Sequence, residues 1–184
     1  NIGGTSFTDA IEIADSKLAF IADSNNQNIY LDAGLSTAAI TIDSIDYDGG
    51  NGLNFNFQST NGADLIIDGI IDDSNTGTAD AASFNFQMTT LNSDFTVTDG
   101  NTLRSRGNDI TINAGGDVSL SKLWSDGGAI NITADNIIDT GATSADINAS
   151  GALVTLNAGG NIGGTAFTSA IEINDAILDI VTTG

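Results

Sequence analysis

The chain has 184 residues and carries 24 acidic but only 4 basic side chains, giving a formal net charge of −20, and it has no cysteine, histidine or proline. The missing cysteine and histidine exclude a disulfide framework, thiolate or imidazole metal ligands and a Ser-His-Asp triad. A charge of −20 repels phosphate backbones, and every apolar run is far shorter than the ~20 residues of a membrane-spanning helix. We therefore expect neither nucleic-acid binding nor membrane insertion.

The choice of polar residues predicts the secondary structure. Asp, Asn and Gly are abundant, whereas Glu and Lys, which normally build helix surfaces, are scarce. Asp, Asn and Gly favour turns, and the many Ile and Thr residues are β-branched and favour strands. The composition therefore predicts an all-β chain with many tight turns and little or no helix.

A long repeat frames the chain. Residues 1–13 (NIGGTSFTDAIEI) and 161–173 (NIGGTAFTSAIEI) are identical at 11 of 13 positions, at a spacing of 160. We interpret residues 1–160 as one long tandem repeat and residues 161–184 as the start of the next copy. Because the sequence also begins without an initiator Met or a signal-like segment, we expect it to be part of a longer parent chain.

The middle of the chain, residues 44–106, is less regular. Its strand candidates are 53–57, 64–67, 83–88 and 94–98, and turn-rich spacers separate them. Two pairs of Phe residues at a spacing of two put each pair on one strand face. They are expected to form the core of wider rungs, and an aromatic ligand platform is the alternative. Whether this region stays on the same solenoid as the rest is left open.

The second half has a shorter rhythm. Four similar strands, 109–114, 129–134, 153–158 and 177–181, follow one another at offsets of 20, 24 and 24, and Gly/Asp/Asn corners separate them. A rung of about 22 residues with short alternating strands predicts a parallel β-helix, in which stacked rungs bury their inner faces. The Asn residues that follow strands (Asn113, Asn148 and Asn157) are expected either to form a corner ladder or to be ordinary turn residues.

The phrases ITINAGGDVSL, GAINITADNI, ASGALVTLNAGGNIG and LNSDFTVTDGNTL resemble the repeats of filamentous-haemagglutinin-like large exoproteins. These are long adhesins that Gram-negative bacteria export by two-partner secretion. The resemblance is densest over residues 91–173. It implies a right-handed parallel β-helix shaft, surface exposure and a role in adhesion or cell contact. The family's secretion motif is not seen in this sequence, so export by that route is implied only by analogy.

Calcium is the one cofactor that the residues suggest. Hard cations take six to eight oxygen ligands, often from acidic Gly-rich loops. Two loops have this character, and the stretch 49–57 is similar to one calcium-binding β-roll nonapeptide, with Asn54 and Asn56 departing from that pattern. The candidate ligands are Asp46, Asp48, Asn51, Asp72, Asp73 and Asp80. The alternative is that these carboxylates are solvated turn residues whose charge is screened by salt.

No residue pattern predicts catalysis, although parallel β-helices do host polysaccharide lyases and hydrolases. The many Asp residues make a pair of carboxylates uninformative as a glycosidase signature. Arg104 and Arg106 form the only basic cluster, and we interpret them as balancing neighbouring Asp charges. We expect the protein not to be an enzyme.

These observations lead to one principal functional hypothesis and two alternatives. The chain is expected to be a structural or adhesive repeat of a giant bacterial surface or secreted adhesin, forming a rigid extracellular shaft or contact surface. Its expected partners are neighbouring copies of the repeat and glycans or proteins on other cells. The alternatives are a calcium-binding surface or matrix module and a carbohydrate-active β-helix.

Overall fold

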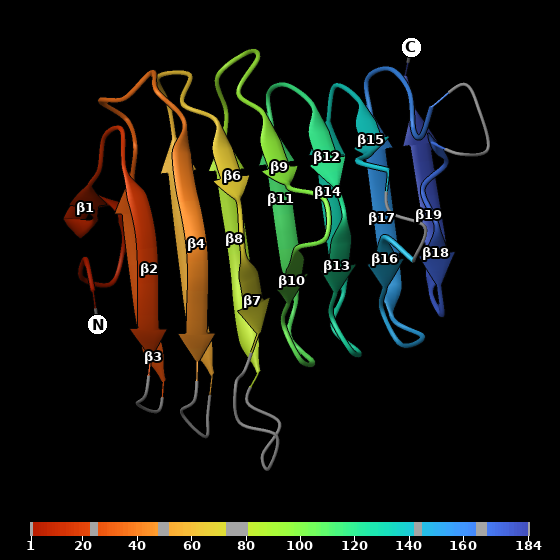
Figure 1. The fold of residues 1–184 in the computed structure, drawn as a ribbon, viewed down its shortest axis with the longest axis horizontal. Coiled ribbons are helices and arrows are strands. Elements are labelled where there is room, and N and C mark those ends of the chain that lie inside the picture. Colours follow the sequence, from red (N-terminus) through yellow and green to blue (C-terminus); the bar gives the residue numbers. More distant parts are fainter. Residues whose placement is uncertain are drawn as a thin grey trace.

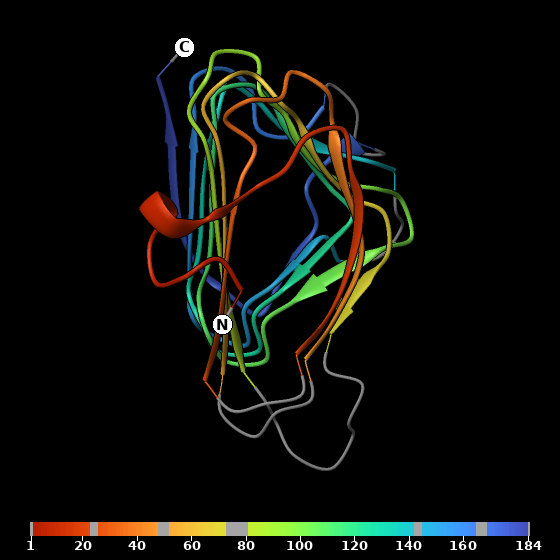
Figure 2. The ribbon, with the colours of Figure 1, turned by 90° about the vertical axis from the view of Figure 1, so that its left-hand side faces the viewer.

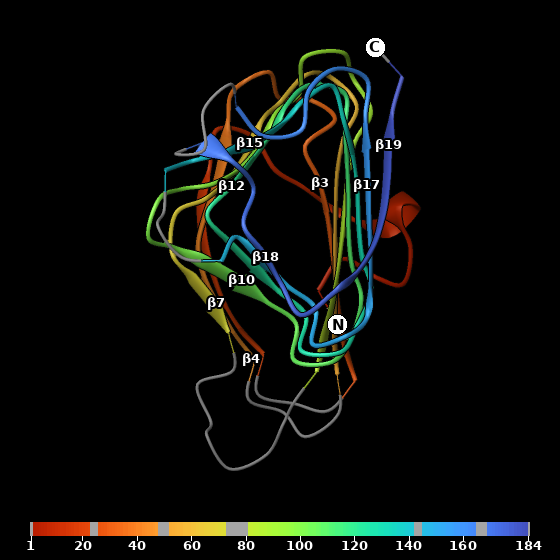
Figure 3. The ribbon, with the colours of Figure 1, turned by 90° about the vertical axis from the view of Figure 1, so that its right-hand side faces the viewer.

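The computed structural model describes residues 2–22, 26–47, 52–72, 81–141, 145–164 and 169–183. Within them the regular secondary structure is almost entirely β-strand, and helix is limited to short 3-10 turns such as η1 (Phe7–Asp9). Every described strand pair is parallel. The strands stack along one axis into a right-handed β-helix of about 6 turns, which Figure 1 shows from the side and Figures 2 and 3 show from its two ends. The predicted parallel β-helix is therefore confirmed.

Sheet A forms one long side of the solenoid and contributes one strand per rung. Its described strands, in spatial order, are β1 (Ile11–Glu12), β3 (Gln27–Asp32), β5 (Leu53–Ser59), β8 (Ala82–Met88), β11 (Ile110–Ala114), β14 (Ile130–Ala134), β17 (Leu153–Ala158) and β19 (Ile177–Thr182). Alternate residues of these strands point inward, as expected for a strand with one buried face. The inward side chains form columns along the axis. One column contains Ile29, Phe55, Phe84, Ile110, Ile130, Val154 and Leu178.

Sheet B forms the opposite side and is bent. Its first two strands, β2 (Lys17–Ala22) and β4 (Ile40–Tyr47), are long and pair with each other. Later rungs divide the same side into an upper and a lower strand. The upper strands are β6 (Leu65–Ile67), β9 (Phe95–Val97), β12 (Val118–Leu120) and β15 (Ile137–Asp139). The lower strands are β7 (Ile70–Asp72), β10 (Thr102–Arg104), β13 (Lys122–Trp124), β16 (Ile147–Asn148) and β18 (Ile173–Asn174).

The bend between upper and lower strands brings neighbouring rungs into close contact. At Gly69, between β6 and β7, a Cβ atom would lie 1.5 Å from the carbonyl oxygen of Asp43. Only glycine fits there, because any side chain would collide with the backbone of the preceding rung. The bend in this rung therefore requires a glycine, which lets the backbones of neighbouring rungs approach closely. The candidate site described below lies at the same bend, on a rung nearer the C-terminus.

Rung length changes along the axis. Successive sheet A partners are separated by 26, 29, 26, 20, 24 and 24 residues, with a mean of about 25. The last three values equal the offsets found in the sequence, whereas the first three are longer than the expected 22. The described parts of residues 44–106 therefore stay on the solenoid and belong to its wider rungs. Their Phe pairs point inward and are fully buried, so the alternative of an aromatic ligand platform is wrong.

Two ladders of polar side chains run along the outside. On sheet A, the amides of Asn56, Asn85, Gln87 and Asn113 are linked by hydrogen bonds of 2.7–3.3 Å. The second ladder lies at the corner leading into sheet B. There one oxygen of each of Asp64, Asp94, Asp117 and Asn136 accepts the backbone N–H of the following rung, at 2.8–3.1 Å. The proposed ladder of Asn113, Asn148 and Asn157 does not form, because Asn148 lies on sheet B and the other two lie on sheet A.

The two copies of the repeated segment occupy different places on the solenoid. Ile2 lies beside Ile29 on sheet A, whereas its counterpart Ile162 lies beside Ile137 on sheet B. Strand β2 lies in sheet B, but the equivalent residues 177–182 form β19 in sheet A. The sequence of the repeat therefore does not fix its position around the axis.

Candidate functional site

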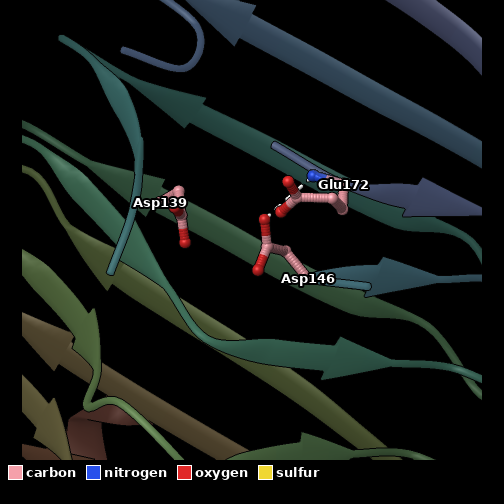
Figure 4. Close-up of side chains that lie close together, drawn as sticks. All are labelled: Asp139, Asp146 and Glu172. Atoms are coloured by element: carbon pink, nitrogen blue, oxygen red, sulfur yellow. Dashed lines mark hydrogen bonds between the residues drawn. The ribbon is translucent and has the colours of Figure 1, made fainter. Parts of the chain in front are cut away.

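Three carboxylates gather at the bend of sheet B near the C-terminal end of the solenoid. Asp139 ends β15, Asp146 immediately precedes β16, and Glu172 immediately precedes β18 on the next rung. One carboxylate oxygen from each residue lies within 4.8 Å of the other two. Figure 4 shows the carboxylates of Asp146 and Glu172 face to face, with Asp139 beside them. We refer to these three residues as the acidic triad.

Asp139 stands at an interior position that is apolar elsewhere. It pairs with Leu120 of the preceding rung, and one and two rungs further back the same column contains Val97 and Ile67. All three of these apolar side chains are fully buried, and Asp139 itself is only 8% exposed. A carboxylate at such a position costs free energy unless a hydrogen bond, a cation or a proton compensates it. The residue is therefore poorly explained by packing alone.

The hydrogen bonds of the triad leave several oxygens without a partner. Asp139 Oδ1 accepts the backbone N–H of Gly141 at 2.7 Å, and Asp146 Oδ2 accepts the backbone N–H of Glu172 at 2.9 Å. Asp139 Oδ2, Asp146 Oδ1 and Glu172 Oε2 are buried and have no hydrogen-bond partner. No ion pair among the described residues involves any of the three carboxylates. The site therefore concentrates negative charge and free acceptor oxygens.

Among the three carboxyl groups, Asp146 has the strongly shifted pKa, and its side chain is fully buried. The pKa of Asp146 is raised to about 7, mainly by burial, and the nearby carboxylates of Asp139 and Glu172 contribute to the rise. The hydrogen bond from the backbone N–H of Glu172 lowers the pKa in part. In the absence of a cation, the fold therefore favours a proton on this carboxylate.

The calcium ligands expected from the sequence do not coincide with the triad. Asp48, Asn51, Asp73 and Asp80 lie outside the described residues. Asp46 and Asp72, predicted in two separate loops, are instead register partners on β4 and β7. Asp46 has one buried oxygen without a hydrogen-bond partner. Asp72 is engaged by arginine, so the structure does not present this pair as two free carboxylates.

The basic cluster balances acidic charge, as the sequence suggested. The Nε and Nη2 atoms of Arg106 donate to the two oxygens of Asp72 at 2.6 and 3.1 Å. Arg104 lies 3.6 Å from the same carboxylate, donates to Asp126 and stacks over the ring of Trp124. Both guanidinium groups are thus committed to neighbouring side chains.

A second notable surface is the last strand of sheet A. Among the described strands, β19 pairs only with β17, and all six of its residues are exposed. Leu178 and Ile180 are aligned with the fully buried Val154 and Leu156, yet they are 48% and 51% exposed. The interior columns of the solenoid therefore end in uncovered apolar side chains.

The chain was compared with protein-family models, curated proteins and solved structures, and no match was found. No helix in the described residues is long and apolar enough to cross a membrane.

Sequence reasoning missed the acidic triad. Its members are separated by up to 33 positions and converge only through the rung register. Asp139 ends a three-residue strand and Asp146 precedes a two-residue strand, and at such positions Asp normally indicates a turn. The one available signal was the alignment of Asp139 with Leu120, which required the exact strand register.

Proposed function

We propose that this chain is a rigid, rod-forming repeat segment of a large bacterial surface or secreted adhesin. The observation that carries the proposal is the uncovered end of the solenoid at β19. The proposed role of the chain is mechanical, because a rigid rod holds a contact surface away from the cell. We assign no catalytic step to the chain.

The end strand, β19, exposes apolar side chains at positions that are buried in the preceding rungs. Leu178 and Ile180 continue two of the interior columns of sheet A and remain half exposed. Exposed strand edges with apolar faces pair readily with further strands. One more rung in the same register would cover both side chains and the free edge of β19, so the rod is built for continuation.

The repeated segment supports the same conclusion. Residues 161–164 and 169–174 continue the solenoid directly after β17, through the Ile162 bridge and β18, and no Pro- or Ser-rich linker intervenes. Successive copies would therefore stack end to end rather than form separate domains joined by flexible linkers. The partners of this segment are accordingly neighbouring copies of the repeat.

The adhesive and extracellular part of the proposal has support that is separate from the exposed end strand. It comes from the resemblance of residues 91–173 to adhesin repeats and from the acidic, polar exterior. Contact partners of this class are glycans or proteins on other cells. Antibodies against the chain should label intact source cells, and labelling only after permeabilisation would contradict a surface location.

Small-angle scattering tests the rod directly. A chain with two consecutive 160-residue copies should be longer than the single copy by about 30 Å, since each turn of about 25 residues advances roughly 4.8 Å. The cross-section should stay constant, because the copies stack coaxially. A two-copy particle with a flexible bend at the join would overturn the proposal.

A pair of matched variants locates the join. In the two-copy chain, Ile180→Asp places a charge in the interior column and should bend or loosen the junction. Val181→Asp adds the same charge at the outward position aligned with Asn157 and should leave the rod straight. Equal behaviour of the two variants would contradict burial of β19 between copies.

A further inference from the structure

We propose that Asp139, Asp146 and Glu172 bind one calcium ion at the bend of sheet B. The assignment goes beyond the role of the chain as a rod and does not depend on it. It rests on the size of the cluster, on its buried unpartnered oxygens and on its lack of any compensating positive group.

The size of the cluster fits calcium. Calcium–oxygen bonds are about 2.3–2.6 Å long, so two ligands on opposite sides of the ion lie about 4.6–5.2 Å apart. The three candidate oxygens lie within 4.8 Å of one another. Magnesium has shorter bonds of about 2.0–2.1 Å, requires near-octahedral geometry and gives up its water reluctantly, so carboxylates contributed by two rungs suit the more flexible coordination of calcium better. All the ligand atoms are carboxylate oxygens, which hard cations prefer.

Burial provides an independent reason to expect a ligand. Asp146 is fully buried and Asp139 is 8% exposed, and each has one oxygen that no hydrogen bond satisfies. Such oxygens are rare in folded proteins, because a buried acceptor that loses water without replacement costs free energy. Glu172 Oε2 is also buried and unpartnered, and the three carboxylates lie beside one another, as Figure 4 shows. A divalent cation would satisfy all three at once and neutralise most of their charge.

Other acidic groups lack this combination. In the corner ladder, Asp64, Asp94 and Asp117 use one oxygen each to accept a backbone N–H of the next rung. Asp72 is paired with two arginines. The acidic triad is distinguished because its carboxylates face one another without a cation from the protein.

The ion would connect two rungs. Asp139 and Asp146 flank the bend of one rung, whereas Glu172 belongs to the following rung and to the repeated segment 161–173. Its counterpart in the first copy, Glu12, is exposed in β1. Calcium at the triad would therefore clamp the start of the second copy onto the rung that precedes it.

The single tryptophan makes binding observable at this place. The indole N–H of Trp124 donates to the carbonyl of Ala145 at 3.4 Å, and Ala145 directly precedes Asp146. Terbium is an oxygen-seeking substitute for calcium that emits when a nearby tryptophan is excited. After treatment with a chelator, the full chain should show Trp-sensitised terbium emission that saturates at one equivalent and is displaced by calcium.

Three variants decide the assignment. Asp146→Asn and Glu172→Gln keep the size of the side chain but each removes a charged ligand, so each should weaken calcium binding at least about tenfold. Asp15→Asn removes the same charge at an exposed site at the other end of the rod and should bind as the parent does. Circular dichroism would verify that each variant remains folded.

Several results would overturn the proposal. One is the absence of saturable terbium emission from the parent chain, and another is equal binding by Asp15→Asn and both triad variants, which would indicate diffuse attraction to the acidic surface. Displacement by magnesium at the same concentration as calcium would overturn the choice of calcium.

Discussion

The wide rungs near the N-terminal end and the narrow rungs near the C-terminal end solve the same packing problem with different side chains. In the wide rungs, β5 and β8 have seven residues each and four inward positions, which include the pairs Phe55/Phe57 and Phe84/Phe86. In the narrow rungs, β11 and β14 have five residues and three inward positions, filled by Ile and Ala. Figure 1 shows the taller strands on its left side. Side-chain volume and rung length thus change together, so that the interior stays filled along the axis.

The two regions also differ in how they use the interior. The wide rungs hold an aromatic cluster in which Phe86 lies 5.0 Å from Phe95 and stacks on Phe84 at 6.1 Å between ring centroids. In the narrow region, the same solenoid accepts Asp139 at an interior position. The large aromatic side chains therefore lie in the wide rungs, and the candidate ligand site lies in the narrow ones.

The largest expected effect comes from emptying the aromatic cluster. Phe86→Ala removes a fully buried ring and should cost about 3–5 kcal/mol, because the surrounding rungs cannot collapse into the cavity. Thermal melts by circular dichroism would measure it. Because one continuous core joins both regions, the fluorescence of Trp124 should report the same lowered midpoint. An unchanged Trp124 transition would show that the two regions unfold separately.

A second substitution tests whether the interior of the narrow rungs has space for a larger side chain. Ile132→Phe should cost about 1–3 kcal/mol, because a five-residue strand with fully buried neighbours has no space for a ring. The control is Ile132→Leu, which conserves volume and should cost less. If Ile132→Phe were neutral, rung length would not set the size of the interior. Both free energies can be obtained from denaturant unfolding.

Much of this comparison could be predicted from sequence, and the reasons are specific. The strings ITINA and INITA alternate strictly and end at Gly or Asp corners, so their offsets gave the register of the narrow rungs directly. In the wide rungs, the strand predicted at 53–57 is observed at Leu53–Ser59, but the lower strands β7 and β10 are only three residues long and their pattern is too short to predict them.

The acidic triad could not be predicted for a different reason. Whether Asp139 points inward depends on the parity of β15, and a shift of one residue would turn it to solvent. Likewise, the described residues of the nearly identical segments 1–13 and 161–173 lie on different sheets, so local sequence does not decide their place. Both features are set by the rungs on which a segment stacks.

A smaller effect is expected at the triad itself. With chelator present at pH 8, Asp146→Asn should raise the melting temperature by a few degrees, because it removes a buried charge that faces two other carboxylates. With calcium present, the parent chain should gain stability and the variant should not. Differential scanning calorimetry at fixed ionic strength would measure both. A lower melting temperature of the variant in chelator would mean that the charge of Asp146 is already compensated.

The smallest effect is expected in the corner ladder, which crosses from wide to narrow rungs. Burial raises the pKa of Asp94, and the carboxylates of Asp64 and Asp117 on the adjacent rungs add to the rise, while the N–H of Asp117 opposes it. The folded state thus holds this proton more tightly than the unfolded state, whose carboxyl titrates near 3.8. The contribution of Asp94 to stability is therefore complete below that value and is lost as the pH rises through the folded pKa.

Asp94→Asn should escape this loss. Asn136 occupies the equivalent ladder position two rungs on and accepts the N–H of Asn161 through its amide oxygen, so an amide can replace the carboxylate at position 94. The melting temperature of Asp94→Asn relative to the parent should therefore rise between pH 4 and pH 6, with Asp15→Asn as the control for net charge. A difference that stays constant with pH would show that the ladder holds Asp94 ionised without cost.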